Sequence, residues 1–172
     1  MGCYRKSAVE AFEKVETLVR AWLEEERITR VDVYLNGLGD VGDTRCRLTT
    51  DGERKSVHVD RNAGSAINKL RGMQALSGRG AWFYSHLWME MPEGVLHQES
   101  DWMCEPDMGF DEVPLGSCKT ELDHYPRDQE FIPDWLRYKV ERWRLERGPV
   151  VARRVAHLEE EFRLEGGKYR YP

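Results

Sequence analysis

Residues 31–59, VDVYLNGLGDVGDTRCRLTTDGERKSVHV, contain three short runs in which apolar and polar side chains alternate. One phase of this alternation is formed by Val31, Val33 and Leu35, then by Thr44, Cys46 and Leu48, and finally by Val57 and Val59. A period of two is typical of strands that bury one face, and Asn36-Gly37 and Asp51-Gly52 are dipeptides typical of tight turns. The stretch therefore predicts a set of antiparallel strands with turns at these two dipeptides.

A second pair of strands is predicted further along the chain. Residues 81–91, AWFYSHLWMEM, and residues 95–103, VLHQESDWM, are rich in aromatic side chains, which favour strands. They flank the turn sequence Pro92-Glu93-Gly94. We expect a long hairpin whose aromatic side chains contribute to the core, which brings the sheet to about five strands.

Helices are predicted on both sides of these strands. Ser7 and Glu10 fit a capping box at the start of an apolar pattern over residues 7–27. A second, shorter helix is expected over residues 65–76, and Gly78-Arg79-Gly80 ends it.

The C-terminal part of the sequence divides into a loop and two helices. Residues 104–126 are punctuated by proline and glycine at irregular spacing and are expected to form an extended surface loop. Asp134 can cap a helix over residues 135–147, and a last helix is expected over residues 151–162.

These elements predict one α+β domain spanning residues 1–172, in the order α-βββ-α-ββ-αα, with helices packed on an antiparallel sheet. A hydrophobic content of 40% supports a substantial core despite a charged fraction of 33%. Trp22, Trp82 or Trp88, and Trp135 lie at apolar positions of their elements and are expected to be mostly buried.

No apolar run is long enough to span a membrane and no signal sequence is recognisable, so a cytoplasmic protein is expected.

Motifs that mark enzymes of common classes are missing from the sequence, including nucleophile elbows, phosphate loops and zinc-protease helices. Zinc ligands, or a nucleophile with its base, can be drawn from His97, Cys104, Cys118 and His124, but no close Cys pair and no orienting third group accompanies them. Asp107, Asp111 and Glu112 lack the spacing of a calcium loop. We therefore predict no catalytic residues, no metal and no cofactor.

The charge distribution is more informative than these motifs. Between Arg79 and Lys119 the chain has no Lys or Arg, whereas acids are frequent there, and the C-terminal helical segment is Arg-rich. A net charge of -5 argues against nucleic acid as the partner. Residues 105–112, EPDMGFDE, which we call the acidic loop, place the apolar side chains of Met108 and Phe110 among carboxylates. This composition favours binding to a partner whose pocket has a basic rim, over the alternative that the acids only form a solvated surface. The predicted partner-binding residues are Glu105, Asp107, Met108, Phe110, Asp111 and Glu112, with Arg79 of the glycine loop as a second choice.

Over residues 81–136, an aromatic strand pair and an acidic loop are followed by two short motifs, Tyr125-Pro126-Arg127 and Ile132-Pro133-Asp134-Trp135-Leu136. This succession, about a third of the chain, resembles bacterial immunity proteins of polymorphic toxin systems. The resemblance is to the YezG-like kind and to the kind that neutralises necrotizing-toxin-type NAD glycohydrolases. It implies a cytosolic inhibitor that needs no cofactor and plugs the active site of its cognate toxin in a heterodimer.

The expected function is therefore an antitoxin that blocks a secreted bacterial toxin, with an NAD glycohydrolase or a nuclease as the expected target and no membrane or nucleic-acid partner. The alternative is a small-molecule or nucleotide-binding enzyme that uses the aromatic hairpin as a pocket. A scaffold or regulator is the third possibility.

Overall fold

The computed structural model describes residues 2–109 and 112–147, with side chains described from residue 7 onward. In chain order the elements are α1 (Gly2–Glu26), β1 (Arg30–Leu38), β2 (Val41–Thr50), β3 (Glu53–Val57), α2 (Arg61–Met73), β4 (Tyr84–Glu90), β5 (Leu96–Asp101), α3 (Leu115–His124) and the 3-10 turn η1 (Gln129–Phe131). A further helix covers residues 134–147. The predicted α+β class and element order are confirmed, while the helix expected over residues 151–162 lies outside the described residues.

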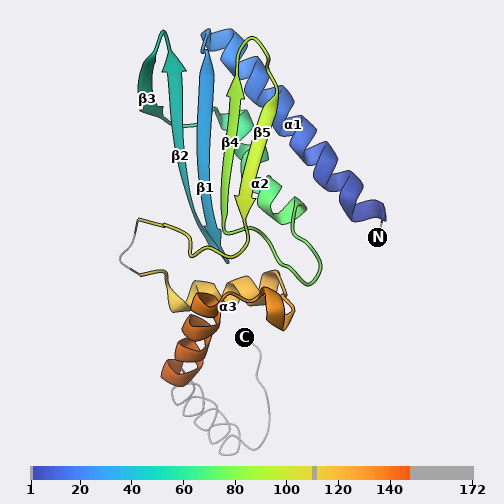
Figure 1. The fold of residues 1–172 in the computed structure, drawn as a ribbon, viewed down its shortest axis with the longest axis vertical. Coiled ribbons are helices and arrows are strands. Elements are labelled where there is room, and N and C mark those ends of the chain that lie inside the picture. The colour runs from blue at the N-terminus through green and yellow to red at the C-terminus, as the bar shows by residue number, and fades with distance from the viewer. Residues whose placement is uncertain (1, 110–111, 148–172) are drawn as a thin grey trace, which may run out of the picture.

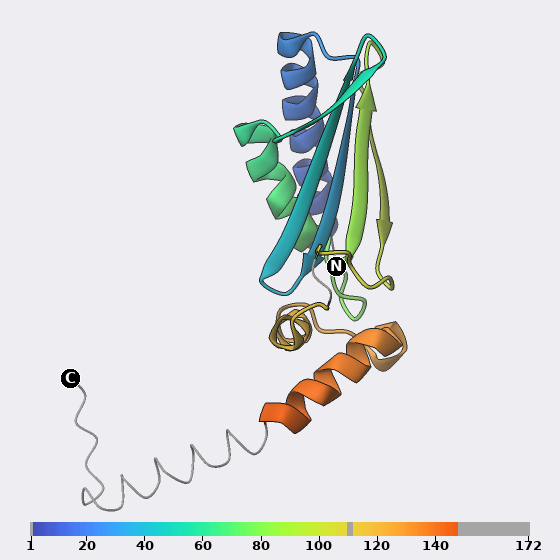
Figure 2. The same ribbon diagram turned by 90° about the vertical axis from the view of Figure 1, so that its left-hand side faces the viewer.

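The five strands form one antiparallel sheet in the order β3-β2-β1-β4-β5 (Figure 1). Helices α1 and α2 pack on one face of this sheet, and no helix among the described residues covers the opposite face (Figure 2). The alternation of apolar and polar residues determines which face of the sheet the helices cover, because Val31, Val33 and Leu35 all point into the core beneath them. We call the sheet together with α1 and α2 the sheet layer.

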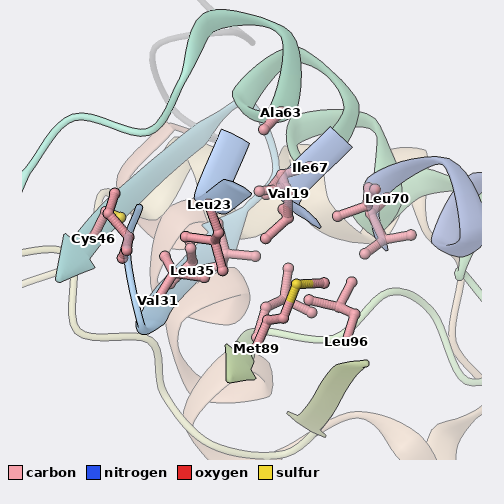
Figure 3. Close-up of a cluster of buried hydrophobic side chains, with 14 of the residues drawn as sticks. Val19, Leu23, Val31, Leu35, Cys46, Ala63, Ile67, Leu70, Met89 and Leu96 are labelled. Carbon is pink, nitrogen blue, oxygen red and sulfur yellow. The ribbon is translucent and has the colours of Figure 1, made fainter. Parts of the chain in front are cut away.

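The core of the sheet layer joins both helices to the central strands. Asp60 accepts hydrogen bonds from the backbone N–H groups of Asn62 and Ala63, and so caps the start of α2. The apolar faces of α1 and α2 meet the sheet in a continuous cluster (Figure 3). Its fully buried members include Val19, Leu23, Ile67, Leu70 and Met89.

The first turn is displaced from its predicted position. Asn36 and Gly37 belong to β1, and the ladder continues to the pair Leu38 and Val41, so the turn is formed by Gly39 and Asp40. Leu38 is fully buried in a second apolar cluster. Its burial favours continuing the pairing of β1 with β2 beyond Asn36, to the pairs Gly37–Gly42 and Leu38–Val41. Gly39 has φ of 59°, and a Cβ there would lie 2.5 Å from the carbonyl oxygen of Ser117, so the turn requires glycine.

Helix α3 lies inside the segment predicted to be an extended loop. Its buried residues are Ser117, Cys118 and Glu121, so it shows no apolar stripe from which a helix would be recognised. The helix packs with the helix over residues 134–147 against the end of the sheet (Figure 1). We call residues 102–147 the end layer, and its apolar cluster contains Leu38, Phe83, Met108, Val113, Cys118, Leu136 and Val140.

The tryptophan prediction is confirmed for Trp82, which is 2% exposed. Trp22 and Trp135 are partly buried at the edges of the two clusters. Trp135 donates its indole N–H to the carbonyl of Met103, which anchors the start of its helix. The expectation that the hairpin aromatics build the core holds for Trp82 and Phe83, whereas Trp88 lies on the uncovered face of the sheet.

Candidate functional site

The uncovered face of the sheet carries polar and aromatic side chains, which we call the open face. Strand register places on this face Asp43, Arg45, Arg47 and Thr49 from β2, Arg30, Asp32, Tyr34 and Asn36 from β1, and Tyr84, His86, Trp88 and Glu90 from β4. The flanking strands add Arg54 and Ser56 from β3 and His97, Glu99 and Asp101 from β5. The other phase of β1, β2 and β4 supplies Val31, Val33, Leu35, Cys46, Leu87 and Met89 to the core of the sheet layer.

A row of rings runs over the open face from β1 to β5. Tyr34 and His86 stack with centroids 4.5 Å apart, and Trp88 and His97 stack at 5.2 Å. His86 and Trp88 join the two pairs at 4.8 Å, and Arg47 lies 5.7 Å from the Tyr34 centroid. Because the stacked rings cover one another's faces, they present mainly their edges to solvent. The row therefore suits contact with another protein better than intercalation of a planar base.

Asp32 connects this row to a charged network. Its carboxylate accepts two hydrogen bonds of 2.7 Å from the guanidinium of Arg30 and lies 2.9 Å from Nε2 of His86. Arg30 also pairs with Glu90. The Arg30 guanidinium, with His86, lowers the pKa of Asp32 although burial opposes this shift. The centre of the open face is thus largely neutralised within the chain.

A hollow of about 390 Å³ opens at one end of this face, beside the end layer. Its lining consists of Tyr34, Asn36, Arg45, Arg47, Tyr84, Cys104, Glu105 and Asp107. Burial raises the pKa of the Tyr84 hydroxyl, and burial raises the pKa of the Cys104 thiol to about 11. Both groups are therefore neutral at physiological pH, and the charge of the hollow comes from its arginines and carboxylates.

The acidic loop predicted from the sequence forms the rim of this hollow. Asp107 lies 3.1 Å from the guanidinium of Arg45 on β2, and its other oxygen accepts the backbone N–H of Gly109 at 2.9 Å. The Gly109 N–H and then Arg45 lower the pKa of Asp107. The carboxylate is 71% exposed, so it remains accessible to a partner while its position is fixed.

The other described acids of the loop are held by the end layer. Glu105 and Glu112 lie 3.1 Å and 3.2 Å from the ammonium group of Lys139, and Glu112 also lies 2.8 Å from Arg142. Lys139 and Arg142 lower the pKa of Glu112. The loop is thus tied to β2 at one point and to the helix over residues 134–147 at another.

The remaining predicted binding residues have different surroundings. Met108 is 7% exposed and belongs to the apolar cluster of the end layer, so it anchors the loop from inside and does not project toward a partner. Phe110 and Asp111 lie outside the described residues. Arg79 is exposed and stacks on Phe131 with 4.9 Å to the ring centroid.

A buried charged group fastens the end layer to the sheet. Glu121 is fully buried and accepts hydrogen bonds of 2.7 Å from Arg71 of α2 and from the backbone N–H of Gly39. Arg127 lies 3.6 Å from the second oxygen of Glu121 and donates to the carbonyls of Ala81, Trp102 and Phe131. Burial lowers the pKa of Arg127. The Tyr-Pro-Arg motif therefore has a structural role, because Arg127 joins four segments of the chain.

Sequence reasoning missed the cations that hold the acidic loop, namely Arg45, Lys139 and Arg142. They are distant in sequence from the loop, and charge composition alone does not indicate which cation meets which acid. It also missed the ring row, although the polar phase of the predicted strands contains Tyr34 and His86 and would have indicated it.

Within the described part of the chain, no group of three or more His, Cys, Asp and Glu residues lies close enough to hold a metal ion. Cys118 is fully buried in the end-layer cluster, and Cys104 is partly buried at its edge. No helix among the described residues is long and apolar enough to cross a membrane.

A scan against protein-family models and a search of curated proteins found no match to this chain.

Proposed function

We propose that the protein is an immunity-type inhibitor that binds a secreted bacterial toxin in the cytosol and blocks its active site. The observation that carries this proposal is the acidic loop, whose carboxylates are exposed yet fixed by Arg45, Lys139 and Arg142 beside the hollow. Charges that are already positioned bind with a smaller loss of conformational entropy than charges on a free loop. They also steer a basic partner during encounter.

The expected toxin is an enzyme that cleaves NAD or nucleic acid. Such enzymes hold phosphate groups with basic side chains, so a loop that presents carboxylates at matching positions competes for the same groups. The motif succession over residues 81–136 supports the same class of function through its resemblance to immunity proteins. Met108 is buried and so cannot be the apolar group that contacts the toxin. That contact must come from Phe110 or from the ring edges of the open face.

Co-expression with a candidate toxin encoded beside this gene tests this function. The parent protein should rescue growth, and the triple variant E105Q/D107N/E112Q should lose rescue while remaining folded. A matched control is E10Q/E24Q/E25Q, which removes the same charge from exposed positions of α1. The proposal fails if the toxin stays lethal in the presence of abundant folded parent protein.

A second candidate function is binding of a small anionic ligand in the hollow, favoured by Arg45 and Arg47 beside two tyrosines. A thermal-shift screen with nucleotides and dinucleotides tests it, because a ligand at 100 times its Kd stabilises the fold by about 2.7 kcal/mol. Ligand binding that R47Q abolishes, together with failure of toxin rescue, would favour this second function over the first.

A further inference from the structure

The charges of the open face are divided between its two sides. Arg45, Arg47 and Arg54 lie on β2 and β3, whereas Glu90, Glu99 and Asp101 lie on β4 and β5. Strand β1 runs between the two sides, because the sheet order is β3-β2-β1-β4-β5. Asp43 also lies on the first side, so three arginines and one acid give that half a net charge of +2, whereas the second half has three acids, no Lys or Arg, and a net charge of -3. One half of the face is therefore basic and the other half acidic, and the ring row extends from β1 over the acidic half.

Not all of these charges are satisfied within the chain. Glu90 pairs with Arg30, and Arg45 pairs with Asp43 and Asp107. Among the described residues, by contrast, Arg47, Arg54, Glu99 and Asp101 form no ion pair, and all four are exposed. The unpaired cations lie on one side of β1 and the unpaired acids lie on the other.

We propose that a second copy of this chain covers the open face, in a dimer whose twofold axis runs along β1 between the two sheets. Rotation about this axis exchanges the two sides of the face, so the basic half of each copy meets the acidic half of the other. Rotation about an axis across the strands would instead place like charges together. The charge division therefore selects one of the two face-to-face arrangements.

The strand register identifies the contacts. In the strand register, Asp32 lies opposite Arg47 of β2 and opposite Trp88 of β4. Arg47 and Trp88 therefore lie at the same level on opposite sides of β1. In the dimer Arg47 lies opposite the edge of the Trp88 ring of the second copy. Glu99 of β5 is the acid nearest to this position, because it lies opposite His86 in the strand register and His86 is the ring next to Trp88. Each dimer has two such pairings of Arg47 with Glu99.

The size of the face fits a weak dimer. Five strands about 4.8 Å apart and about six residues long give a face of roughly 24 by 20 Å, or about 1,000 Å² buried over both copies. This value lies below the range of about 1,200 to 2,000 Å² that is typical of stable specific interfaces, so we expect a weak dimer. Aromatic rings beside charged groups are a usual composition of such interfaces.

Sedimentation velocity from about 1 μM to about 1 mM tests the dimer. At high concentration the mass should approach twice the 20.2 kDa of the chain. R47E and E99R should each weaken the dimer by about tenfold or more, because each substitution creates repulsion at two symmetric contacts. An equimolar mixture of R47E and E99R should form a heterodimer, and the double variant R47E/E99R should recover self-association.

Matched controls are R61E on α2 and E25R on α1, which make the same charge changes at exposed positions on the helix-covered side. Both should dimerise like the parent, and R47Q with E99Q provides a milder pair if either reversal impairs folding. A parent protein that stays monomeric throughout overturns the proposal and leaves the face to the toxin. A dimer that neither reversal weakens overturns the assignment to the open face. These measurements need no toxin, so they succeed or fail independently of the proposed function.

Discussion

In the sheet layer and in the end layer, the helices contact the sheet through different kinds of buried side chain. Helices α1 and α2 meet the sheet through a continuous apolar cluster. Helix α3 meets it through a smaller cluster together with the buried charges of Glu121, Arg71 and Arg127. An apolar core tolerates exchanges of single residues that conserve volume, whereas a buried carboxylate is stable only with its cations in place. The end layer, which carries the acidic loop, therefore depends on fewer and more specific contacts.

Trp82 and Phe83 allow the largest test of this difference, because these adjacent residues belong to different clusters. Trp82→Ala and Phe83→Ala should each lower the free energy of unfolding by about 3 to 5 kcal/mol, measured by chemical denaturation. Hydrogen exchange should then separate them. Trp82→Ala should speed exchange in the sheet layer, and Phe83→Ala should speed it mainly in α3 and residues 134–147. Identical exchange patterns would show that the two layers form one cooperative unit.

Glu121→Gln should have the next largest effect. The amide keeps an acceptor for the N–H of Gly39 but leaves Arg71 and Arg127 without a compensating charge, so we expect a loss of about 3 kcal/mol in the free energy of unfolding. Asp123→Asn is the control, since Asp123 lies on the same helix but is exposed, and should cost less than about 1 kcal/mol. Equal effects of the two substitutions would remove the special role of the buried charges.

This difference also explains what the sequence could predict. The strands, α1 and α2 show their apolar periodicity directly, so their order was predictable, although the first turn was misplaced by the Asn36-Gly37 signal. Helix α3 is buried through Ser117, Cys118 and Glu121, and no hydropathy pattern identifies it. Charge composition located the acidic loop, but it could not indicate that Met108 points inward or that Lys139 would hold two of the acids. Such pairings depend on tertiary contacts between distant segments.

The cysteines provide a test of intermediate size that depends on pH. Burial raises the thiol pKa of Cys46 to about 12 and of Cys104 to about 11. Only the thiolate is alkylated, so Cys104 should react roughly a hundredfold more slowly in the folded protein near pH 8 than in denaturant. The folded state retains these protons, so their stabilising contribution should be lost as the pH rises from about 9 toward 11. Peptide-resolved alkylation measures the rates, and a plateau for Cys104 near pH 9 would contradict the shifted pKa.

The smallest effect on stability is expected at the rim of the hollow. Asp107 and Arg45 are both exposed, so Asp107→Asn should change the melting temperature by no more than about 2 °C. Its effect on toxin binding should be larger, because a rim charge steers encounter: association should slow, its salt dependence should weaken, and dissociation should change little. Arg45→Gln should not slow association in the same way, since it removes a cation and leaves the Asp107 carboxylate charged and still bonded to Gly109.

Glu53→Gln is the matched control for Asp107→Asn. Glu53 is an equally exposed acid beside a cation, Lys55, but it lies on the outer strand β3. Both substitutions change the net charge by one unit, so a general charge effect would slow association equally in both. Stopped-flow association at two salt concentrations distinguishes the cases. If Asp107→Asn binds the toxin at the rate of Glu53→Gln, the toxin does not approach over the acidic loop, and Arg79 beside Phe131 becomes the next position to substitute.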